Sequence, residues 1–439
     1  MTRLAAYHVL RSGHPFPTRQ VDPECHRLGL DPRDRGFVRQ LVGLEIRRRS
    51  TLRAILGMFL ERKPKPELIT HLSLGLVQLL FMDRVPDHAA LSETLDAVNR
   101  TLGASKVPFV NGVLHNVIRA RGEGLCGDPQ KDLIGVNVHM EIPVFRHPET
   151  HPLLWAEDAY SIPAPLFKRW VKRYGQERAE RLARTFLNPP PLVLRALGDR
   201  EALLEELASI EVQARAGNAA STIVCGSNFT GAVMESAAFR EGRLTVQGET
   251  AAAAGELLQP QAGESLIDLC AAPGGKTAVL AASGAKVLAI DVDERRLERV
   301  LDTCTRLGVQ ANVETLVSDG LAALPADQLV DGILIDAPCS NTGVLGARAE
   351  ARWRFGPAQQ SELKALQARL LREAAAHTRP GGRIVWSTCS IEPEENERQL
   401  KEFLSEFGEW SLEEERAALP DTQAGPWDGG YCARLRRSS

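Results

Sequence analysis

The chain has 439 residues, more than one compact core accommodates, and this length predicts two or three domains. Hydrophobic residues make up 44% of the chain and charged residues 25%, as in globular proteins, and no stretch approaches the ~20 apolar residues that span a bilayer. The net charge of −3 does not by itself indicate a nucleic-acid partner. The opening sequence "MTRLAAYHVLRSGHPF" lacks the apolar core and cleavage site of a secretory signal, so we expect a cytoplasmic protein.

Eight cysteines are spread along the chain, at Cys25, Cys126, Cys225, Cys270, Cys304, Cys339, Cys389 and Cys432. They form no CxxC pair and have no companion histidines at zinc-finger spacing, so we expect neither a metal site nor a disulfide framework. In a reducing compartment they are free thiols, and most are expected to be packing residues.

The first 120 residues have the apolar periodicity of helices. Leu72, Leu76, Leu79 and Leu80, for example, follow the i, i+4, i+7, i+8 pattern of one helical face. Several amphipathic helices with short connections predict an all-α bundle. From 121 to about 160, sequences such as "RGEGLCGDPQ" and "IPVFRHPETHP" break helices without strand alternation, and we expect a linker or extended connection there.

Two segments are locally basic. Residues 1–65 hold fourteen Lys and Arg against six Asp and Glu, including the run Arg47 to Arg49, and residues 160–184 hold seven against two. A solvated helix face explains either cluster alone. Two clusters upstream of a catalytic-looking domain favour a phosphate-binding surface. Residues 161–250 combine a basic amphipathic helix, the "NPPP" break, the short apolar run "LVLRAL" and the helix "REALLEELASI", which predicts a small α+β unit.

After "AAAAGELL", short apolar runs alternate with helical ones, at 265–270, 286–291, 312–319, 332–339 and 383–390. A helix with Leu363, Leu366 and Leu370 on one face, closed by "PGG", separates the last two runs. This βαβ series predicts a mostly parallel sheet with helices on both faces, in which ligands bind beyond the carboxyl ends of the strands. Those ends carry Asp268, Asp291, Asp319, Asp336, Cys339 and Cys389.

The segment "DLCAAPGGKT" is neither a P-loop, because Cys270 stands where a glycine is required, nor a GxGxxG fingerprint. It predicts a tight turn at Gly274 and Gly275 that opens a helix and lets a ligand approach the backbone. Asp291 ends the second strand, where a carboxylate accepts hydrogen bonds from ribose hydroxyls, and Asp319 ends the next, within reach of a purine amino group. Each acid alone is also explained as a helix cap or turn former. Together they favour S-adenosylmethionine over a dinucleotide.

Three motifs in order, "DLCAAPGGKT", "DAPCSNTG" and "STCSIEPEENE", closely resemble the signatures of the Sun-type family of S-adenosylmethionine-dependent RNA cytosine-5 methyltransferases. Upstream, "DPRDRGFVRQLVGLEIRRRSTLRAIL" and "VPFVNGVLHNVIR" look like the helical RNA-binding fold of the antitermination factor NusB. The resemblance implies an α/β, Rossmann-like methyltransferase domain at 251–439. It is preceded by an all-α NusB-like domain at 1–140, a linker at 141–160 and a small α+β RNA-binding subdomain at 161–250.

The chemistry of this family explains two cysteines. Carbon 5 of cytosine is a poor nucleophile until a thiolate adds to carbon 6, and the adduct must later lose its carbon-5 proton and expel the thiolate. The resemblance implies that Cys389 is the nucleophile and that Cys339 assists breakdown of the adduct, the reverse of DNA cytosine-5 methyltransferases. It implies that Asp336 contacts the base at N3 and the amino group and that Lys276 aids this step, although a surface lysine on a first helical turn is the alternative.

The cofactor site implied by the resemblance comprises the turn and the strand-end acids, namely Cys270, Ala271, Ala272, Pro273, Gly274, Gly275, Lys276, Asp291, Asp319 and Asp336. A helix beginning at Pro393 is expected to lower the pKa of Cys389 through its dipole, while Glu392, Glu394 and Glu395 oppose this effect. The sequence leaves the balance open.

The implied substrate is small-subunit ribosomal RNA, methylated by a monomer without a metal ion or a membrane. The target cytosine must be unpaired or flipped out of its helix. The chain departs from the family at Asn341, where a small residue is common, and at "GARAEARWR", which replaces a basic stretch, so contacts to the target are expected to differ there. The alternatives are an RNA-binding assembly or antitermination factor with an idle methyltransferase domain, and a DNA cytosine-5 methyltransferase.

Overall fold

The computed structural model describes residues 1–420 and 425–439 and divides the chain into two compact units. The first comprises Met1–Asn188 together with Arg348–Trp353, and the second comprises Pro189–Ala347 and Arg354–Ser439. The chain therefore leaves the second unit, contributes six residues to the first, and returns. The predicted segment boundaries near 140, 160 and 250 stay a prediction. In the part of the chain that is described, no helix combines the length and the apolar character that crossing a membrane demands.

The first unit begins with helices, as the periodicity predicts. They are α1 (Thr2–Arg11), α2 (Val21–Arg27), α3 (Pro32–Phe59), α4 (Pro66–Phe81), α5 (Asp87–Leu102) and α6 (Val107–Arg119). The side chain of Asp31 caps α3 by accepting from the Asp34 N–H at 2.8 Å, and Pro32 occupies the first turn, where its missing N–H costs nothing. Leu72, Leu76 and Leu80 are all buried, which confirms the apolar face of α4.

The segment predicted as a linker or extended connection contains two short strands and a helix. Residues 121–160 hold the antiparallel strands β1 (Arg121–Glu123) and β2 (Val138–Met140) and the helix α7 (Pro152–Tyr160). The prediction was wrong here because the proline that looks like a helix breaker stands at the first helical position, where it starts a helix. Trp155 and Tyr160 anchor α7 in the interior. Helices α8 (Ala164–Tyr174) and α9 (Gln176–Thr185) follow.

The arginine run in α3 is mostly structural. Arg48 is 2% exposed and donates to the Ile134 carbonyl at 2.6 Å, and Arg49 pairs with Glu45 one helical turn earlier at 2.6 Å. Burial lowers the pKa of Arg48 to about 10, yet the guanidinium stays charged at neutral pH. These arginines contribute to packing, which accounts for part of the local charge excess that favoured a phosphate-binding surface.

The second unit contains two sheets. The smaller is antiparallel with the order β4-β5-β3-β6, formed by β3 (Leu192–Ala196), β4 (Ala214–Ala216), β5 (Thr222–Cys225) and β6 (Leu244–Val246). Helices α10 (Arg200–Ser209), α11 (Thr230–Glu235) and α12 (Ala237–Arg240) belong to the same region. Leu194, Leu207 and Ile223 share its small core, so the strand "LVLRAL" and the helix "REALLEELASI" form as predicted.

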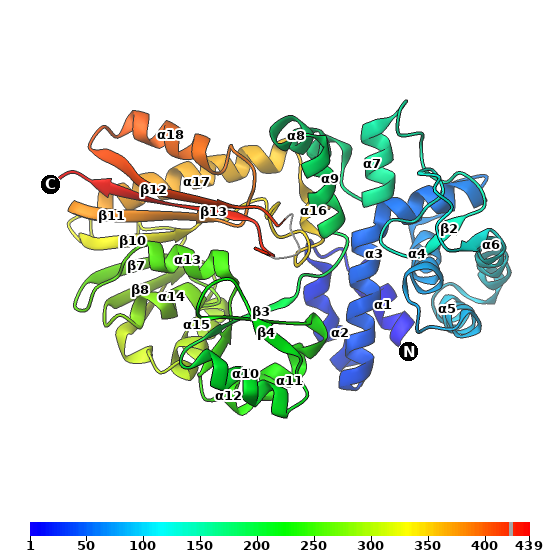
Figure 1. Cartoon of the computed structure of the whole chain (residues 1–439), viewed down its shortest axis with the longest axis horizontal. Helices are drawn as coiled ribbons and strands as arrows, with labels where there is room; N and C mark the ends of the chain where they lie inside the picture. Colours follow the sequence, from blue (N-terminus) through cyan, green and yellow to red (C-terminus); the bar gives the residue numbers. More distant parts are fainter. Residues whose placement is uncertain (421–424) are drawn as a thin grey trace. The chain divides into compact units, whose positions relative to one another are not determined.

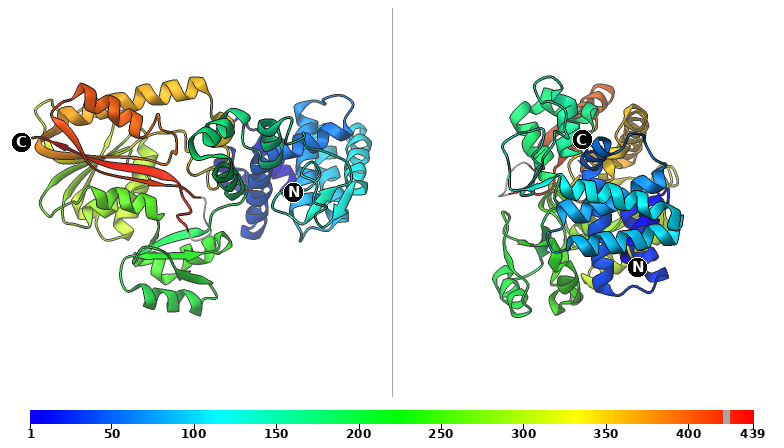
Figure 2. Two further views of the ribbon diagram at one scale, coloured as in Figure 1. Left: turned by 45° about the horizontal axis from the view of Figure 1, so that its top comes forward. Right: turned by 90° about the vertical axis from the view of Figure 1, so that its right-hand side faces the viewer.

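The larger sheet has the order β12-β13-β11-β10-β7-β8-β9. Its strands are β7 (Ser265–Leu269), β8 (Lys286–Asp291), β9 (Val313–Val317), β10 (Val330–Asp336), β11 (Thr378–Thr388), β12 (Trp410–Ala418) and β13 (Gly430–Arg437). The five predicted runs form the parallel part, and β12 and β13 add an antiparallel edge, drawn in red in Figure 2. The "PGG" segment does not close the preceding helix, which ends at His377, but lies inside β11.

Helices cover both faces of this sheet (Figure 1). On one face lie α13 (Glu249–Leu257), α14 (Gly275–Ala281) and α15 (Glu294–Arg306), and on the other lie α17 (Pro357–His377) and α18 (Glu397–Glu406). Trp386 on β11 is fully buried among the residues of the second face. This layered arrangement is the predicted Rossmann-like fold, and it brings the carboxyl ends of neighbouring parallel strands to one edge.

Candidate active site

The two predicted cysteines meet at that edge. Cys339 follows β10 and Cys389 follows β11, the strand paired with it, and their Sγ atoms are 3.3 Å apart. Cys339 is 7% exposed, whereas Cys389 is partly exposed and is the more accessible thiol. The contact with Cys389, burial and the nearby Glu395 carboxylate hold the pKa of Cys339 well above its ordinary value. Cys339 is therefore a neutral thiol at neutral pH.

Asn341 contacts both cysteines. Its side-chain N–H donates to the Cys339 carbonyl at 2.7 Å, and its Oδ1 accepts from the Cys389 thiol at 3.2 Å. The backbone of Asn341 has φ +61°, a left-handed conformation that asparagine adopts more easily than most residues. Sequence reasoning marked Asn341 only as a departure from the family.

A buried carboxylate lies behind the cysteines. Glu395 is 3% exposed and accepts from the Ser340 N–H at 2.8 Å and from the hydroxyls of Ser340 and Ser390. Those serines directly follow Cys339 and Cys389, so one carboxylate fixes the backbone after both thiols. Sequence reasoning treated Glu395 only as an opposing charge. The repeated Cys-Ser pair, with an acid five residues after the second serine, was the available signal.

The predicted helix dipole is absent at this point. Helix α18 begins at Glu397, whereas the prediction placed its start at Pro393. Asn396 instead ties the intervening turn to the strand end, accepting from Thr388 Oγ1 at 2.6 Å and donating to the Ser390 carbonyl at 2.9 Å. The argument that a helix start at Pro393 lowers the pKa of Cys389 was therefore wrong.

Lys276 and Asp336 form an ion pair beside the cysteines. Lys276 Nζ lies 2.8 Å from Asp336 Oδ2, and the Lys276 side chain is 15% exposed. Burial opposes the lysine charge, but attraction to Asp336 outweighs it and raises the pKa of Lys276. Attraction to the charged form of Cys389 also raises the pKa of Lys276, to a lesser extent than Asp336 does. The alternative of a solvated surface lysine does not describe this geometry.

The turn between β7 and α14 is built for close backbone approach. Gly274 has φ +99°, and a Cβ there would lie 2.8 Å from the Val300 Cα. Cys270 also adopts a positive φ of 65°, at the first residue of the turn. Residues 270–276 therefore follow one compact path, and the Ala271 N–H donates to the Ile290 carbonyl at the end of β8.

The strand-end acids lie in different environments. Asp268 is fully buried and accepts from Thr277 Oγ1 at 2.6 Å, and burial raises its pKa to about 7. Asp291 is 2% exposed, accepts from the Ala272 N–H at 3.2 Å and lies 2.9 Å from the Arg296 guanidinium. The side chain of Asp319 is 76% exposed and pairs with Arg369.

These residues fit S-adenosylmethionine. The buried Oδ1 of Asp268 has no hydrogen bond, which leaves one acceptor unused beside the turn, whereas Asp291 Oδ1 is paired with Arg296. The close packing of Gly274 against Val300 on α15 excludes a side chain and fixes the path of the turn. Among the residues that the structure describes, no cluster of three or more His, Cys, Asp or Glu side chains is arranged to hold a metal ion.

Comparison with known proteins identifies the family. The profile of the family "16S rRNA methyltransferase RsmB/F" matches residues 255–425, and that of the NusB family matches residues 8–119. A probable ribosomal RNA small subunit methyltransferase B from Synechocystis is 32% identical over 430 residues, which cover 94% of this chain and 91% of the relative. The chain belongs to the RsmB/F family of 16S rRNA methyltransferases.

Two further relatives agree. A probable ribosomal RNA small subunit methyltransferase B from Bacillus subtilis is 29% identical over 86% of this chain and 81% of its own length. A methyltransferase homolog protein from Pyrococcus horikoshii, known from a crystal structure, is 27% identical in sequence. The two structures superpose with a TM-score of 0.56 over 65% of this chain and 99% of the Pyrococcus chain. Family membership confirms the predicted enzyme class, a SAM-dependent RNA methyltransferase, its cofactor and the NusB-like N-terminal region. The roles of individual site residues stay predictions.

Proposed function

We propose that this protein methylates carbon 5 of a cytosine in small-subunit ribosomal RNA through a covalent adduct with Cys389. The single observation that carries the proposal is the 3.3 Å contact between Cys389 and Cys339 Sγ at adjacent strand ends. The names of the relatives specify small-subunit ribosomal RNA, which supports this substrate class. An RNA substrate of this kind also favours a cytoplasmic location, and we expect a monomer that needs no metal ion.

The partial exposure of Cys389 suits it to attack. Cys389 gives up its proton to solvent, its sulfur forms a bond to carbon 6 of the cytosine, and the displaced electron pair makes carbon 5 nucleophilic. Cys339 acts at the elimination step: a water molecule takes the carbon-5 proton, the bond between carbon 6 and Cys389 Sγ breaks, and the neutral Cys339 thiol, 3.3 Å away, donates a hydrogen bond to the departing Cys389 thiolate. Its raised pKa suits this later role, because Cys339 remains a thiol while Cys389 attacks.

The Lys276–Asp336 pair stabilises the charge that the cytosine ring carries during attack. Addition of a thiolate to carbon 6 is easier when the ring carries a proton at N3, and Asp336 is the acceptor that favours this protonated ring. Lys276 holds the Asp336 carboxylate in place and provides the compensating positive charge. A partly buried ion pair of this type is oriented before the base arrives, so little reorganisation is needed during the reaction.

The turn Cys270–Lys276, together with Asp291 and Asp319, would hold the cofactor. When bound, S-adenosylmethionine supplies the methyl group that carbon 5 accepts. Asp291 would accept hydrogen bonds from ribose hydroxyls, and its partner Arg296 would reorient to allow this. The exposed Asp319 lies at the neighbouring strand end, where it would contact the purine.

Bisulfite sequencing of small-subunit ribosomal RNA tests the proposal. RNA from cells lacking the protein is compared with RNA from cells that express the wild type or Cys389→Ala. The proposal predicts one cytosine that is protected from conversion only with the wild type. Equal protection in all three samples would contradict it, and an RNA-binding factor without chemistry would give no protected cytosine in any sample.

A further inference from the structure

A hollow of about 330 Å³ lies within the second unit, between the small antiparallel sheet and the segment that precedes β13. Its lining includes Pro191, Gln213, Arg215, Val224 and Trp427. The Arg215 guanidinium lies over the Trp427 ring, 5.3 Å from the ring centroid. The lining therefore combines an aromatic ring and a guanidinium with apolar side chains and the Gln213 carboxamide.

This hollow is linked to the catalytic loop through backbone hydrogen bonds. The Gly429 N–H donates to the Gly343 carbonyl at 2.8 Å, and the Gly343 N–H donates to the Cys389 carbonyl at 3.0 Å. A Cβ on Gly343 would lie 2.4 Å from the Gly429 oxygen, so the two strands of backbone touch. Trp427 is two residues from Gly429 and hence within about 7 Å of it along the chain.

We propose that this hollow binds an unpaired nucleobase of the RNA substrate, a few nucleotides from the target cytosine, stacked against Trp427 and Arg215. The proposal rests on the proposed function, since it assigns a subsite for the same RNA. Aromatic rings and guanidinium planes are the groups on which proteins stack splayed-out bases. The Gln213 carboxamide can donate to and accept from a base edge. A nucleobase stacked in this hollow would fix the position of the RNA strand, so that the target cytosine lies at the two cysteines.

The experiment measures RNA affinity by fluorescence anisotropy for the wild type, Trp427→Ala, Trp427→Phe and Arg215→Ala, using fragments of small-subunit ribosomal RNA. Single abasic substitutions are then scanned along a fragment that binds. Arg240→Ala, an exposed arginine on α12 of the same region, is the matched charge control. Covalent trapping by the wild type on 5-azacytidine RNA is measured separately.

Trp427→Ala is expected to weaken binding about 5- to 150-fold, Trp427→Phe much less, and Arg240→Ala little. One abasic position should weaken binding to the wild type and have no effect on Trp427→Ala, because base and ring act as one pair. The proposal would be overturned if Trp427→Ala bound RNA as tightly as the wild type. It would also be overturned if, at every position, the abasic substitution weakened binding to Trp427→Ala as much as it weakens binding to the wild type. If the wild type formed no covalent adduct, the proposed function would be rejected. The anisotropy measurements would still report separately whether the hollow binds a base.

A second observation concerns the nucleophile and is independent of RNA. The Asn341 amide is oriented by its donation to the Cys339 carbonyl, which leaves its Oδ1, an acceptor, facing the Cys389 sulfur. An acceptor stabilises the S–H form of a thiol and repels the lone pairs of a thiolate. We infer that Asn341 is a positioning residue that holds the Cys389 thiol in one rotamer before it loses its proton and attacks, while the Lys276 ammonium favours the thiolate.

The rate of Cys389 alkylation by iodoacetamide, followed from pH 6 to 10 by peptide mass spectrometry, tests this inference without substrate. Asn341→Gly suits the positive φ and is expected to lower the apparent pKa of Cys389 by roughly half to one pH unit. Asn341→Asp places a negative charge beside the sulfur and is expected to raise it. Urea unfolding checks that each variant is folded. An unchanged pKa in both variants, or a higher pKa in Asn341→Gly, would overturn the inference.

Discussion

Lys276 and Asp336 illustrate how a partly buried ion pair prepares a residue for catalysis. With a side chain only 15% exposed, Lys276 depends on Asp336 for its charge. Removing the ammonium would leave the Asp336 carboxylate without its nearest counterion, beside the thiols. The charge of this pair, rather than its packing, is what the proposed reaction uses.

Lys276→Met should therefore lower the methylation rate constant by about 10²- to 10³-fold, the loss typical of removing one electrostatic stabiliser. Methionine has a similar length and retains the apolar contacts of the stem. Methyl transfer from radiolabelled S-adenosylmethionine to ribosomal RNA measures the effect. Lys286→Met, at the exposed start of β8, is the control and should keep full activity. A Lys276→Met enzyme with wild-type rate would remove Lys276 from the mechanism.

The protonation of Asp268, a residue of the site, makes the stability of the folded protein depend on pH. Its pKa is about 7 in the folded protein against an ordinary value of 3.8, because burial penalises the charged form. Between these two pH values the folded protein holds a proton that the unfolded chain releases, so the free energy of unfolding falls as pH rises through this window.

Asp268→Asn should flatten this dependence, since an amide does not titrate. Urea unfolding at pH 5 and pH 8 measures the loss of stability for each protein. We expect a smaller loss for Asp268→Asn than for the wild type. The same loss in both would show that Asp268 is ionised throughout, contrary to the environment described here.

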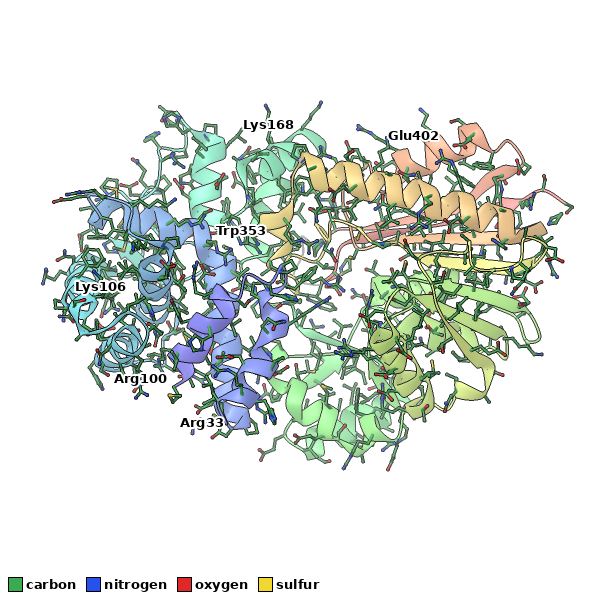
Figure 3. All side chains as sticks on the ribbon, turned by 180° about the vertical axis from the view of Figure 1, so that it is seen from behind. Arg33, Arg100, Lys106, Lys168, Trp353 and Glu402 are labelled. Carbon is green, nitrogen blue, oxygen red and sulfur yellow. The ribbon has the colours of Figure 1, made fainter. Side chains whose placement is uncertain are left out.

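The segment Arg348–Trp353 lies between two parts of the second unit in sequence but belongs to the first unit in the fold. It follows the catalytic loop in sequence and packs within the first unit as the short helix α16 (Ala351–Arg354). Arg352 is fully buried and donates to the carbonyls of Arg47, Ser161 and Phe186. The Trp353 indole donates to the Ile46 carbonyl on α3 at 2.9 Å, and Figure 3 labels this residue.

Arg352→Ala should destabilise the first unit by about 3 kcal/mol or more, because it leaves three buried carbonyls without a donor. Thermal unfolding, followed by circular dichroism, should show a lower midpoint for the helical transition. The exposed Arg348→Ala in the same segment is the matched control. An unchanged midpoint in Arg352→Ala would mean that the three carbonyls find other partners.

The same segment shows where sequence reasoning stopped. The stretch "GARAEARWR" stood out as a departure from the family and was interpreted as altered contact to the target. In the structure Arg352 donates hydrogen bonds to the backbone carbonyls of Ser161 and Phe186, which lie far away in sequence. No local sequence pattern predicts such contacts. By contrast, β8 occupies the predicted range 286–291, because a short apolar run between helical segments is a local signal.

The cysteine pair was predictable because both residues follow parallel strands, and adjacent strand ends meet. The turn at Pro393–Asn396 was not, since a proline after a strand is equally compatible with a helix start and with a turn. Glu395 was also missed. Its role depends on two serines, Ser340 and Ser390, that come together only in the fold.

At the scale of the whole molecule, a protein with a net charge of −3 must bind a polyanion through local charge. In the arginine run of α3, Arg48 does not serve this purpose because it is buried, and Arg49 is paired with Glu45. The second basic cluster is better placed. Lys168, Lys172 and Arg173 lie exposed on α8, and Figure 3 labels Lys168 at the surface of that helix.

Lys168→Gln combined with Lys172→Gln should weaken RNA binding similarly for all sequences and reduce the slope of log K against log salt by about one to two. Filter binding at a series of salt concentrations measures this slope. Lys286→Gln is the control and should leave it unchanged. An unaltered slope in the double variant would place the RNA elsewhere on the protein.

The central claim is that Cys389 attacks the cytosine and Cys339 releases it, and covalent trapping on unmodified substrate RNA tests it most directly. After incubation with S-adenosylmethionine, protein and RNA are denatured and separated by electrophoresis. Cys389→Ala should give neither adduct nor 5-methylcytosine, whereas Cys339→Ala should accumulate a stable protein–RNA adduct that the wild type turns over. An adduct that persists in Cys389→Ala, or that is equally absent from both variants while RNA still binds, would contradict this division of roles.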